Sequence, residues 1–220
     1  MRVYSAQETA IALPYPALIA KISELFAAGV TAPLRHHHSL PNEQGQDNTL
    51  LLMPAWQNHQ GFGGVKIVNV NPNNAQRGLP AVAASYLLFS EKTGEHLALI
   101  NGSVLTARRT AAASALGARY LANPQAQTLL ILGAGRVASE LPDAFSSLFP
   151  IKKVLIWNRT PARSQSLLQE LESTERWNVE LVNDLQAAVA EADIISSATL
   201  AEQPILLGEW LQLGKHVDLI

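Results

Sequence analysis

The chain has 220 residues, of which 48% are hydrophobic and 15% charged, a balance typical of a globular protein with a filled core. Its formal net charge of −2 provides no basic field for nucleic acid, and its lack of cysteine excludes disulfides and thiolate metal sites. No apolar run reaches the roughly 18 residues that a membrane span needs, and residues 1–5 do not begin a secretory signal. We therefore expect a cytoplasmic protein that binds neither nucleic acid nor membrane.

The first half of the chain predicts a helix followed by short strands. Apolar residues at helical spacing predict a helix over 16–28, which Gly29 can end. Strand-like runs separated by turn residues follow at 34–40, 49–53, 65–70, 81–89 and 97–100. Consecutive strands favour an antiparallel or mixed sheet, so we expect an α+β domain here. The alanine-rich residues 106–122 then predict a long helix with Ser103 as its N-cap, ended by Asn123-Pro124.

From Gln127 onward the pattern changes to alternating strands and helices. Strands are predicted at 128–132, 153–157, 179–182, 193–197 and 216–220, and helices at 136–148, 161–172 and 185–190. Pro142 should weaken or bend the first of these helices. The alternation predicts an α/β fold with a Rossmann-type, doubly wound parallel sheet. Since a six-stranded sheet of this type needs another strand and helix, we expect it to be unfinished at Ile220.

The turn after the first strand of this sheet carries a glycine pattern. Gly133-x-Gly135-x-x-Ala138 follows a buried strand and opens a helix, whose free N–H groups would bind a pyrophosphate. Gly133 permits the tight turn, Gly135 lets phosphates approach the backbone, and Ala138 keeps helix and strand close. The alternative is an ordinary tight turn. The predicted pyrophosphate turn consists of Gly133, Ala134, Gly135, Arg136 and Val137.

The end of the second strand favours NADP over NAD. An acidic residue at this position would bind the ribose 2′-hydroxyl, but the chain has Asn158-Arg159-Thr160. Arg159 offers a guanidinium to a 2′-phosphate, and Asn158 and Thr160 add neutral donors. The alternative is a surface arginine that caps the next helix. Weaker candidates, for the nicotinamide-ribose side, follow the fourth strand: Ser197, Ala198 and Thr199.

Three cations lie among apolar neighbours in the first half. Lys66 sits in a strand-like run, although alternation leaves open that it points to solvent. Arg109 follows Arg108 near the start of a helix, where a cation opposes the dipole and a nearby anion, such as a carboxylate, would offset the cost. Arg35 precedes His36-His37-His38 in a predicted strand. Consecutive histidines on a strand alternate faces and cannot share one ion, so we expect no metal site.

These motifs, taken together, resemble the ornithine cyclodeaminase/μ-crystallin family. In family order they are Gly64-Val65-Lys66-Ile67-Val68, Thr106-Ala107-Arg108-Arg109-Thr110-Ala111-Ala112-Ala113-Ser114, the Gly133 turn and Asn158-Arg159-Thr160. With Leu51-Leu52-Met53-Pro54-Ala55-Trp56 and Asn101-Gly102, the chain is most similar to ketimine reductases that act on Δ1-pyrroline-2-carboxylate and Δ1-piperideine-2-carboxylate. The resemblance implies NADPH-dependent reduction of these imines to L-proline or L-pipecolate.

The resemblance also implies an architecture and residue roles. An N-terminal substrate and dimerisation domain over 1–122, with its connecting helix, would precede a dinucleotide-binding domain over 123–220, and the protein would be a homodimer. Lys66 and Arg109 would bind the substrate carboxylate together with Arg35, Thr110 would lie near the cofactor, and Lys66 could polarise the imine or donate its proton. The family's catalytic aspartate follows the strand at 216–220, and we do not equate it with Asp218.

Other family activities stay open at this stage. They are ornithine cyclodeamination with tightly bound NAD, alanine dehydrogenation, and binding of NADP without catalysis.

Overall fold

The computed structural model describes residues 1–220 except 44, 58–60, 200 and 202, and its chain forms two compact units. Unit 1 comprises Met1–Pro14 and Lys21–Thr106, and unit 2 comprises Tyr15–Ala20 and Ala107–Ile220. The boundary falls inside the long helix α3 (Gly102–Leu121), whereas the sequence analysis placed it after that helix, at residue 122.

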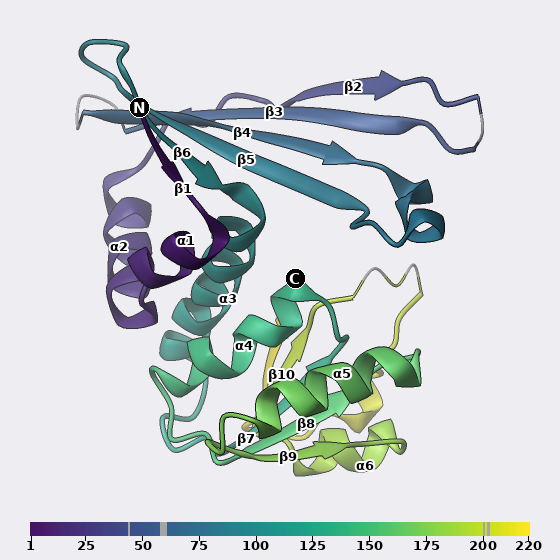
Figure 1. The fold of residues 1–220 in the computed structure, drawn as a ribbon. Helices are drawn as coiled ribbons and strands as arrows, with labels where there is room; N and C mark the ends of the chain where they lie inside the picture. Colours follow the sequence, from purple (N-terminus) through teal and green to yellow (C-terminus); the bar gives the residue numbers. More distant parts are fainter. Residues whose placement is uncertain (44, 58–60, 200, 202) are drawn as a thin grey trace. The chain divides into compact units, whose positions relative to one another are not determined.

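Unit 1 is built on a six-stranded mixed sheet in the order β1-β6-β5-β4-β3-β2 (Figure 1). Its strands are β1 (Arg2–Tyr4), β2 (His36–Leu40), β3 (Asn48–Trp56), β4 (Phe62–Val70), β5 (Val82–Ser90) and β6 (His96–Asn101), with the 3-10 helix η1 (Pro72–Arg77) before β5. All neighbours are antiparallel except β1 and β6, which pair in parallel. The five predicted strands are therefore confirmed, but Arg35 lies in the loop before β2 and not in a strand.

The N-terminal segment contains two elements that the sequence analysis did not predict, β1 and α1 (Ala6–Ala12). A capping box begins α1: the Glu8 amide donates to Ser5 Oγ at 3.2 Å, and the Ser5 amide donates to Glu8 Oε2 at 2.9 Å. The next helix, α2 (Tyr15–Ala28), ends at Gly29 as predicted. Within the described residues no single helix is long and apolar enough to cross a membrane, and α1 and α2 pass such a test only as a pair bent by 72°.

The start of α3 corrects one prediction. The Val104 amide donates to Asn101 Oδ1 at 3.0 Å, so Asn101, the last residue of β6, provides the capping acceptor instead of Ser103. The helix begins at Gly102, where a Cβ would lie 2.6 Å from the carbonyl carbon of Ala84 in β5. Glycine therefore allows α3 to leave the sheet directly after β6 without a loop.

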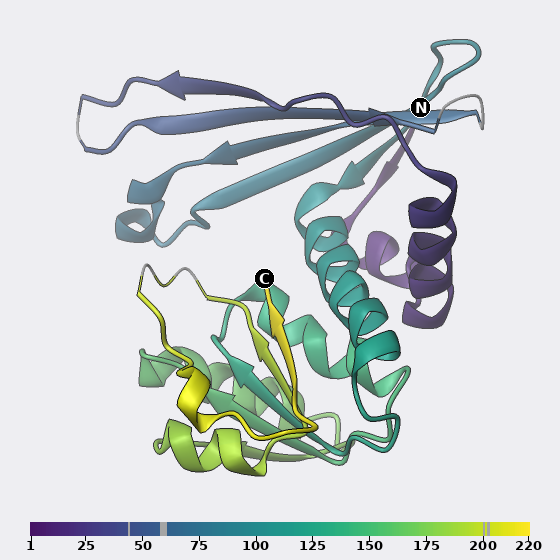
Figure 2. The same cartoon turned by 180° about the vertical axis from the view of Figure 1, so that it is seen from behind.

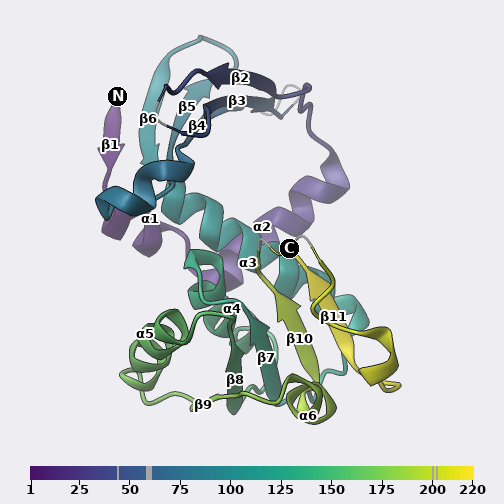
Figure 3. The same ribbon diagram turned by 90° about the vertical axis from the view of Figure 1, so that its right-hand side faces the viewer.

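Unit 2 contains a five-stranded parallel sheet in the order β11-β10-β7-β8-β9, as the sequence predicted. Its strands are β7 (Thr128–Leu132), β8 (Lys153–Trp157), β9 (Asn178–Leu181), β10 (Ile194–Ser197) and β11 (His216–Leu219). Besides the part of α3 that belongs to it, unit 2 has three helices, α4 (Arg136–Ser146), α5 (Pro161–Glu172) and α6 (Leu185–Glu191). A 3-10 helix, η2 (Gly208–Trp210), precedes β11. The connections through α4 and α5 run from β7 to β8 and β9, and the connection through α6 runs back from β9 to β10 on the other side of β7. With right-handed connections, α4 and α5 lie on one face of the sheet and α6 on the other (Figures 2 and 3).

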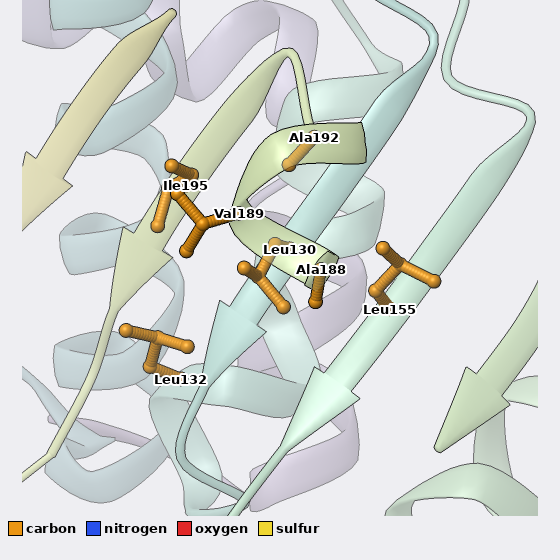
Figure 4. Close-up of a cluster of buried hydrophobic side chains, with 7 residues drawn as sticks. All are labelled: Leu130, Leu132, Leu155, Ala188, Val189, Ala192 and Ile195. Atoms are coloured by element: carbon orange, nitrogen blue, oxygen red, sulfur yellow. The ribbon is translucent and has the colours of Figure 1, made fainter. Parts of the chain in front are cut away.

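Aliphatic side chains hold α6 against this sheet. A buried cluster joins three strands to the helix (Figure 4) and contains Leu130, Leu132, Leu155, Ile195, Ala188, Val189 and Ala192. The strands read as continuous apolar runs because both of their faces are covered. Pro142 lies inside α4 and is buried, and α4 ends two residues before the predicted boundary.

A buried polar cluster links three helical segments within unit 2. Tyr15 donates its hydroxyl to Glu140 Oε2 at 2.6 Å, and Arg108 Nη1 lies 3.0 Å from the same oxygen. The Arg108 guanidinium also stacks on the Tyr15 ring, 4.3 Å from its centroid. Burial, followed by the bond to the Glu140 carboxylate, raises the pKa of Tyr15, so the phenol stays protonated. The cluster thus ties the first turn of α2 and the start of α3 to α4.

We expect Glu140→Ala to lower the free energy of unfolding by about 1–3 kcal/mol, because it removes an acceptor that two partly buried groups share. The matched control is Asp143→Ala on the same helix, whose ion pair with Arg176 is about half exposed and should contribute less than about 1 kcal/mol. Urea denaturation of both variants measures the difference, and equal losses would contradict the structural role of Glu140.

Candidate functional site

A pocket of about 740 Å³ lies at the carboxyl end of the parallel sheet of unit 2. It is lined by the turn after β7, the segment after β8 and the loop after β10. The chain crosses to opposite sides of β7 on its way to β8 and to β10, so the pocket lies at the topological switch point of the sheet. Ligands of open α/β sheets bind at this position.

Gly133 forms the tight turn at the centre of this pocket. Its φ angle is +112°, which side chains other than glycine rarely adopt. A Cβ at this position would lie 2.5 Å from the carbonyl oxygen of Ala198, and the Gly133 amide donates to the carbonyl of Trp157 at 2.8 Å. The turn therefore contacts the ends of both neighbouring strands, which only a residue without a side chain allows.

Gly135 has a different role in the same turn. It is the N-cap of α4 at a φ of −94°, an ordinary value, and no atom lies within 4 Å of a Cβ built there. Because Gly135 lines the pocket, that Cβ would project into ligand space. No side chain caps the N-terminus of α4, which leaves its first N–H groups available to an anion. Ala138 is fully buried on the first turn of α4. These features fit the pyrophosphate of a dinucleotide.

The segment after β8 forms the other wall of the pocket with Asn158, Arg159, Thr160 and Arg163. The Asn158 side chain donates through Nδ2 to the carbonyl of Thr160 at 2.8 Å, which shapes the approach to α5. None of the described lining residues is acidic. This wall therefore lacks, among those residues, the carboxylate that would bind a ribose 2′-hydroxyl.

The pocket brings together most of the predicted cofactor residues. The predicted residues that line it are Gly133, Ala134, Gly135, Asn158, Arg159, Thr160, Ala198 and Thr199. Those outside its lining are Thr110, Arg136, Val137 and Ser197. The sequence analysis missed Trp157, Arg163, Ala201, Gln203, Pro204 and Ile205. The only signal for them is their position in the chain, because they lie at or shortly after the ends of β8 and β10, at the carboxyl edge of the sheet where ligands bind.

Lys66 lies in the middle of β4 in unit 1 and is half-buried. Its register partners are Met53 on β3 and Tyr86 on β5, and it shares a sheet face with the buried Val68. The phenol of Tyr86 crosses the same face at Gly64, where a Cβ would lie 2.2 Å from the hydroxyl oxygen. Burial raises the pKa of Tyr86, so this hydroxyl is a neutral hydrogen-bonding group on the face of Lys66.

The structure distinguishes the two adjacent arginines of α3. Arg108 is bound to Glu140 in the buried cluster, whereas Arg109 has no carboxylate partner among the described residues. Arg109 is exposed, yet partial desolvation lowers the pKa of its guanidinium. Arg109 is therefore the arginine available to an anionic ligand. Lys66 and Arg35 belong to unit 1, whereas Arg109 and Thr110 belong to unit 2. Each pair is therefore described within its own unit.

The three histidines before residue 39 lie on the exposed edge strand β2, and the rings of His36 and His38 are 6.4 Å apart. Across the described part of the chain, no three histidine, aspartate or glutamate side chains form a group that could hold a metal ion.

Comparison with known proteins agrees with this geometry. The Δ1-pyrroline-2-carboxylate reductase of Paracoccus denitrificans is 42% identical over 195 residues, which cover 85% of this chain and 61% of that protein. The structure of the Thermococcus litoralis Δ1-pyrroline-2-carboxylate reductase in complex with NADH and L-proline superposes with a TM-score of 0.82 at 29% identity, covering 100% of this chain and 68% of that one.

An archaeal alanine dehydrogenase dimer with bound NAD gives a TM-score of 0.83 at 25% identity, covering 99% of this chain and 66% of that one. The chain spans about three fifths of the length of the curated relatives it matches. The model of the ornithine cyclodeaminase/mu-crystallin family matches residues 9–220, which include most of unit 1 and all of unit 2. The chain therefore belongs to the ornithine cyclodeaminase/mu-crystallin family.

Proposed function

We propose that this protein catalyses the NAD(P)H-dependent reduction of a cyclic ketimine, Δ1-pyrroline-2-carboxylate or Δ1-piperideine-2-carboxylate, to L-proline or L-pipecolate. The observation that carries the proposal is the pocket around Gly133 at the switch point of unit 2, in a chain 42% identical to a Δ1-pyrroline-2-carboxylate reductase. In this reaction the C=N carbon gains a hydride and the nitrogen gains a proton.

We assign separate roles in this reaction to four residues of the chain. A reduced nicotinamide dinucleotide, when bound, supplies the hydride. Lys66 and Arg109 bind the substrate carboxylate, with Arg35 as a third cation, and so fix which face of the imine is presented. We assign to Thr110, next to Arg109 on α3, a position close to the bound cofactor, although it is not among the residues that line the pocket. Imine reduction needs a protonated nitrogen, and the Lys66 ammonium is our candidate to polarise or protonate it.

We favour NADP over NAD as the cofactor. The support is the guanidinium of Arg159 on a pocket wall that has no acidic residue among its described members. The solved structure of the Thermococcus litoralis reductase contains NADH, and that of the archaeal alanine dehydrogenase contains NAD. The preference is thus a property that we assign to this chain and not to its family.

We further propose a cytoplasmic homodimer with a small imino or amino acid substrate and no nucleic acid or membrane partner. The support for a dimer is the extended sheet of unit 1, whose strands β3 and β5 stay only partly buried in the single chain. The archaeal alanine dehydrogenase is also a dimer.

The function is tested by following NADPH oxidation with Δ1-pyrroline-2-carboxylate, using the protein that carries this chain. We expect Lys66→Ala to lower kcat/KM about 10²–10³-fold, because it removes a charge–charge contact made with the reacting substrate. Lys92→Ala, at an exposed turn between β5 and β6, is the matched control and should leave the rate unchanged.

The same assay separates the other family activities. Proline and ammonia formed from ornithine without net NADH change would indicate a cyclodeaminase, and turnover of pyruvate with ammonia would indicate an alanine dehydrogenase. Bound NADPH without turnover of any of these substrates would indicate a binding protein, and each of these results would overturn the reductase proposal.

The two glycines of the turn should respond differently to the same substitution. We expect Gly135→Ala to leave the melting temperature almost unchanged but to weaken NADPH binding at least tenfold, since its Cβ occupies empty pocket space. Gly133→Ala should unfold the protein at lower temperature even without cofactor, because its Cβ meets the carbonyl of Ala198 and its φ is +112°. Thermal melts and NADPH fluorescence titrations measure both effects.

Gly117→Ala provides the control for this pair. Gly117 lies on the exposed surface of α3 with no atom within 4 Å of a Cβ, so alanine there should stabilise the helix by about 0.5–1 kcal/mol and leave binding intact. A Gly135→Ala variant that binds NADPH normally would contradict the assigned position of the pyrophosphate.

A further inference from the structure

The wall of the pocket after β8 contains a second arginine outside the Asn158-Arg159-Thr160 motif. Arg163 is the third residue of α5, and it lines the same pocket as Arg159. The Arg163 amide donates to the carbonyl of Thr160 at 3.2 Å, which closes the first turn of the helix directly after Arg159. This turn places both arginines on one wall of the dinucleotide pocket.

The charges of these two arginines are not neutralised within the described residues. Neither takes part in an ion pair there, and the first turn of α5 contains no acidic residue. Both side chains are exposed. Two cations at the start of a helix oppose the helix dipole and repel each other, so their arrangement is unfavourable until an anion binds between them. The described pocket lining offers no carboxylate for that purpose.

We propose that Arg163 is a specificity-determining residue that binds the 2′-phosphate of NADP together with Arg159. This inference rests on the proposed preference for NADP. A phosphate monoester carries a charge of about −1.5 to −2 near neutral pH, so one guanidinium leaves part of it uncompensated and two match it. Guanidinium groups also offer paired N–H donors that suit phosphate oxygens. NAD has only a neutral hydroxyl at this position, so Arg163 makes no charge–charge contact with it.

The experiment is a fluorescence titration of the protein with NADPH and with NADH, and a competition with the fragments 2′,5′-ADP and ADP. We expect Arg163→Ala to weaken NADPH and 2′,5′-ADP binding about tenfold to a hundredfold, and NADH and ADP binding less than twofold. Arg163→Lys should restore part of the loss, because it keeps the charge but not the paired donors. Arg119→Ala, an exposed arginine of α3 outside the pocket, should change neither affinity.

The outcomes separate this inference from the cofactor preference on which it rests. If Arg159→Ala selectively weakens NADPH binding while Arg163→Ala does not, the preference stands and the role of Arg163 is wrong. If Arg163→Ala weakens the binding of NADPH and NADH equally, the role of Arg163 is also wrong, since the residue would then support the fold of the pocket. If the unmodified protein binds NADPH no more tightly than NADH, both the preference and the role of Arg163 are wrong.

Discussion

The close approach of one backbone turn to the next strand end is the constraint on which the cofactor pocket depends. Gly133 leaves β7, donates its amide to the end of β8, and faces the carbonyl of Ala198 after β10. Three strand ends therefore converge on a residue without a side chain. This convergence aims the N-terminus of α4 at the pocket and leaves space above Gly135. Without this close approach, the segments after β7, β8 and β10 would not meet around one pocket.

Helix α3 gives neighbouring residues opposite functions. Arg108 is held by Glu140 and Tyr15, so its charge is used within the fold. Arg109, one residue later, points elsewhere because successive helical residues differ by about 100° in direction. The internal ion pair fixes α3 against α4, the helix that begins at the pyrophosphate turn. The exposed Arg109 and the glycine turn before α4 are thus held in one unit by the same buried cluster.

The sequence predicted most of unit 2 because its signals are local and agree with one another. Apolar strands, a glycine turn and helices alternate at short spacing, so each element supports the next. The N-terminal strand β1 was missed because three residues carry too little pattern, and its pairing partner β6 is more than 90 residues away. Ser103 was chosen as a cap by residue type, but the chain already turns into α3 at Asn101, since Gly102 fits against β5.

Only the pocket residues that belong to a sequence motif could be predicted from the sequence. The glycines and Asn158-Arg159-Thr160 have fixed spacing from a strand, so their place in the pocket was predicted before the structure. Arg163 has no such motif, and only the geometry of the first turn of α5 brings it to the pocket wall. The loop after β10 was missed for the same reason, because its lining residues are defined by the path of the chain and not by their type.

The residues that we assign to cofactor and substrate belong to both units. Every described residue that lines the dinucleotide pocket belongs to unit 2, whereas Lys66 and Arg35 belong to unit 1. A substitution on β4 therefore changes no described residue of the pocket lining. A reductase and an alanine dehydrogenase both share this fold, so the fold alone does not determine the reaction. Under the proposed function, we expect the face of Lys66, with the neutral phenol of Tyr86 beside it, to set the substrate specificity.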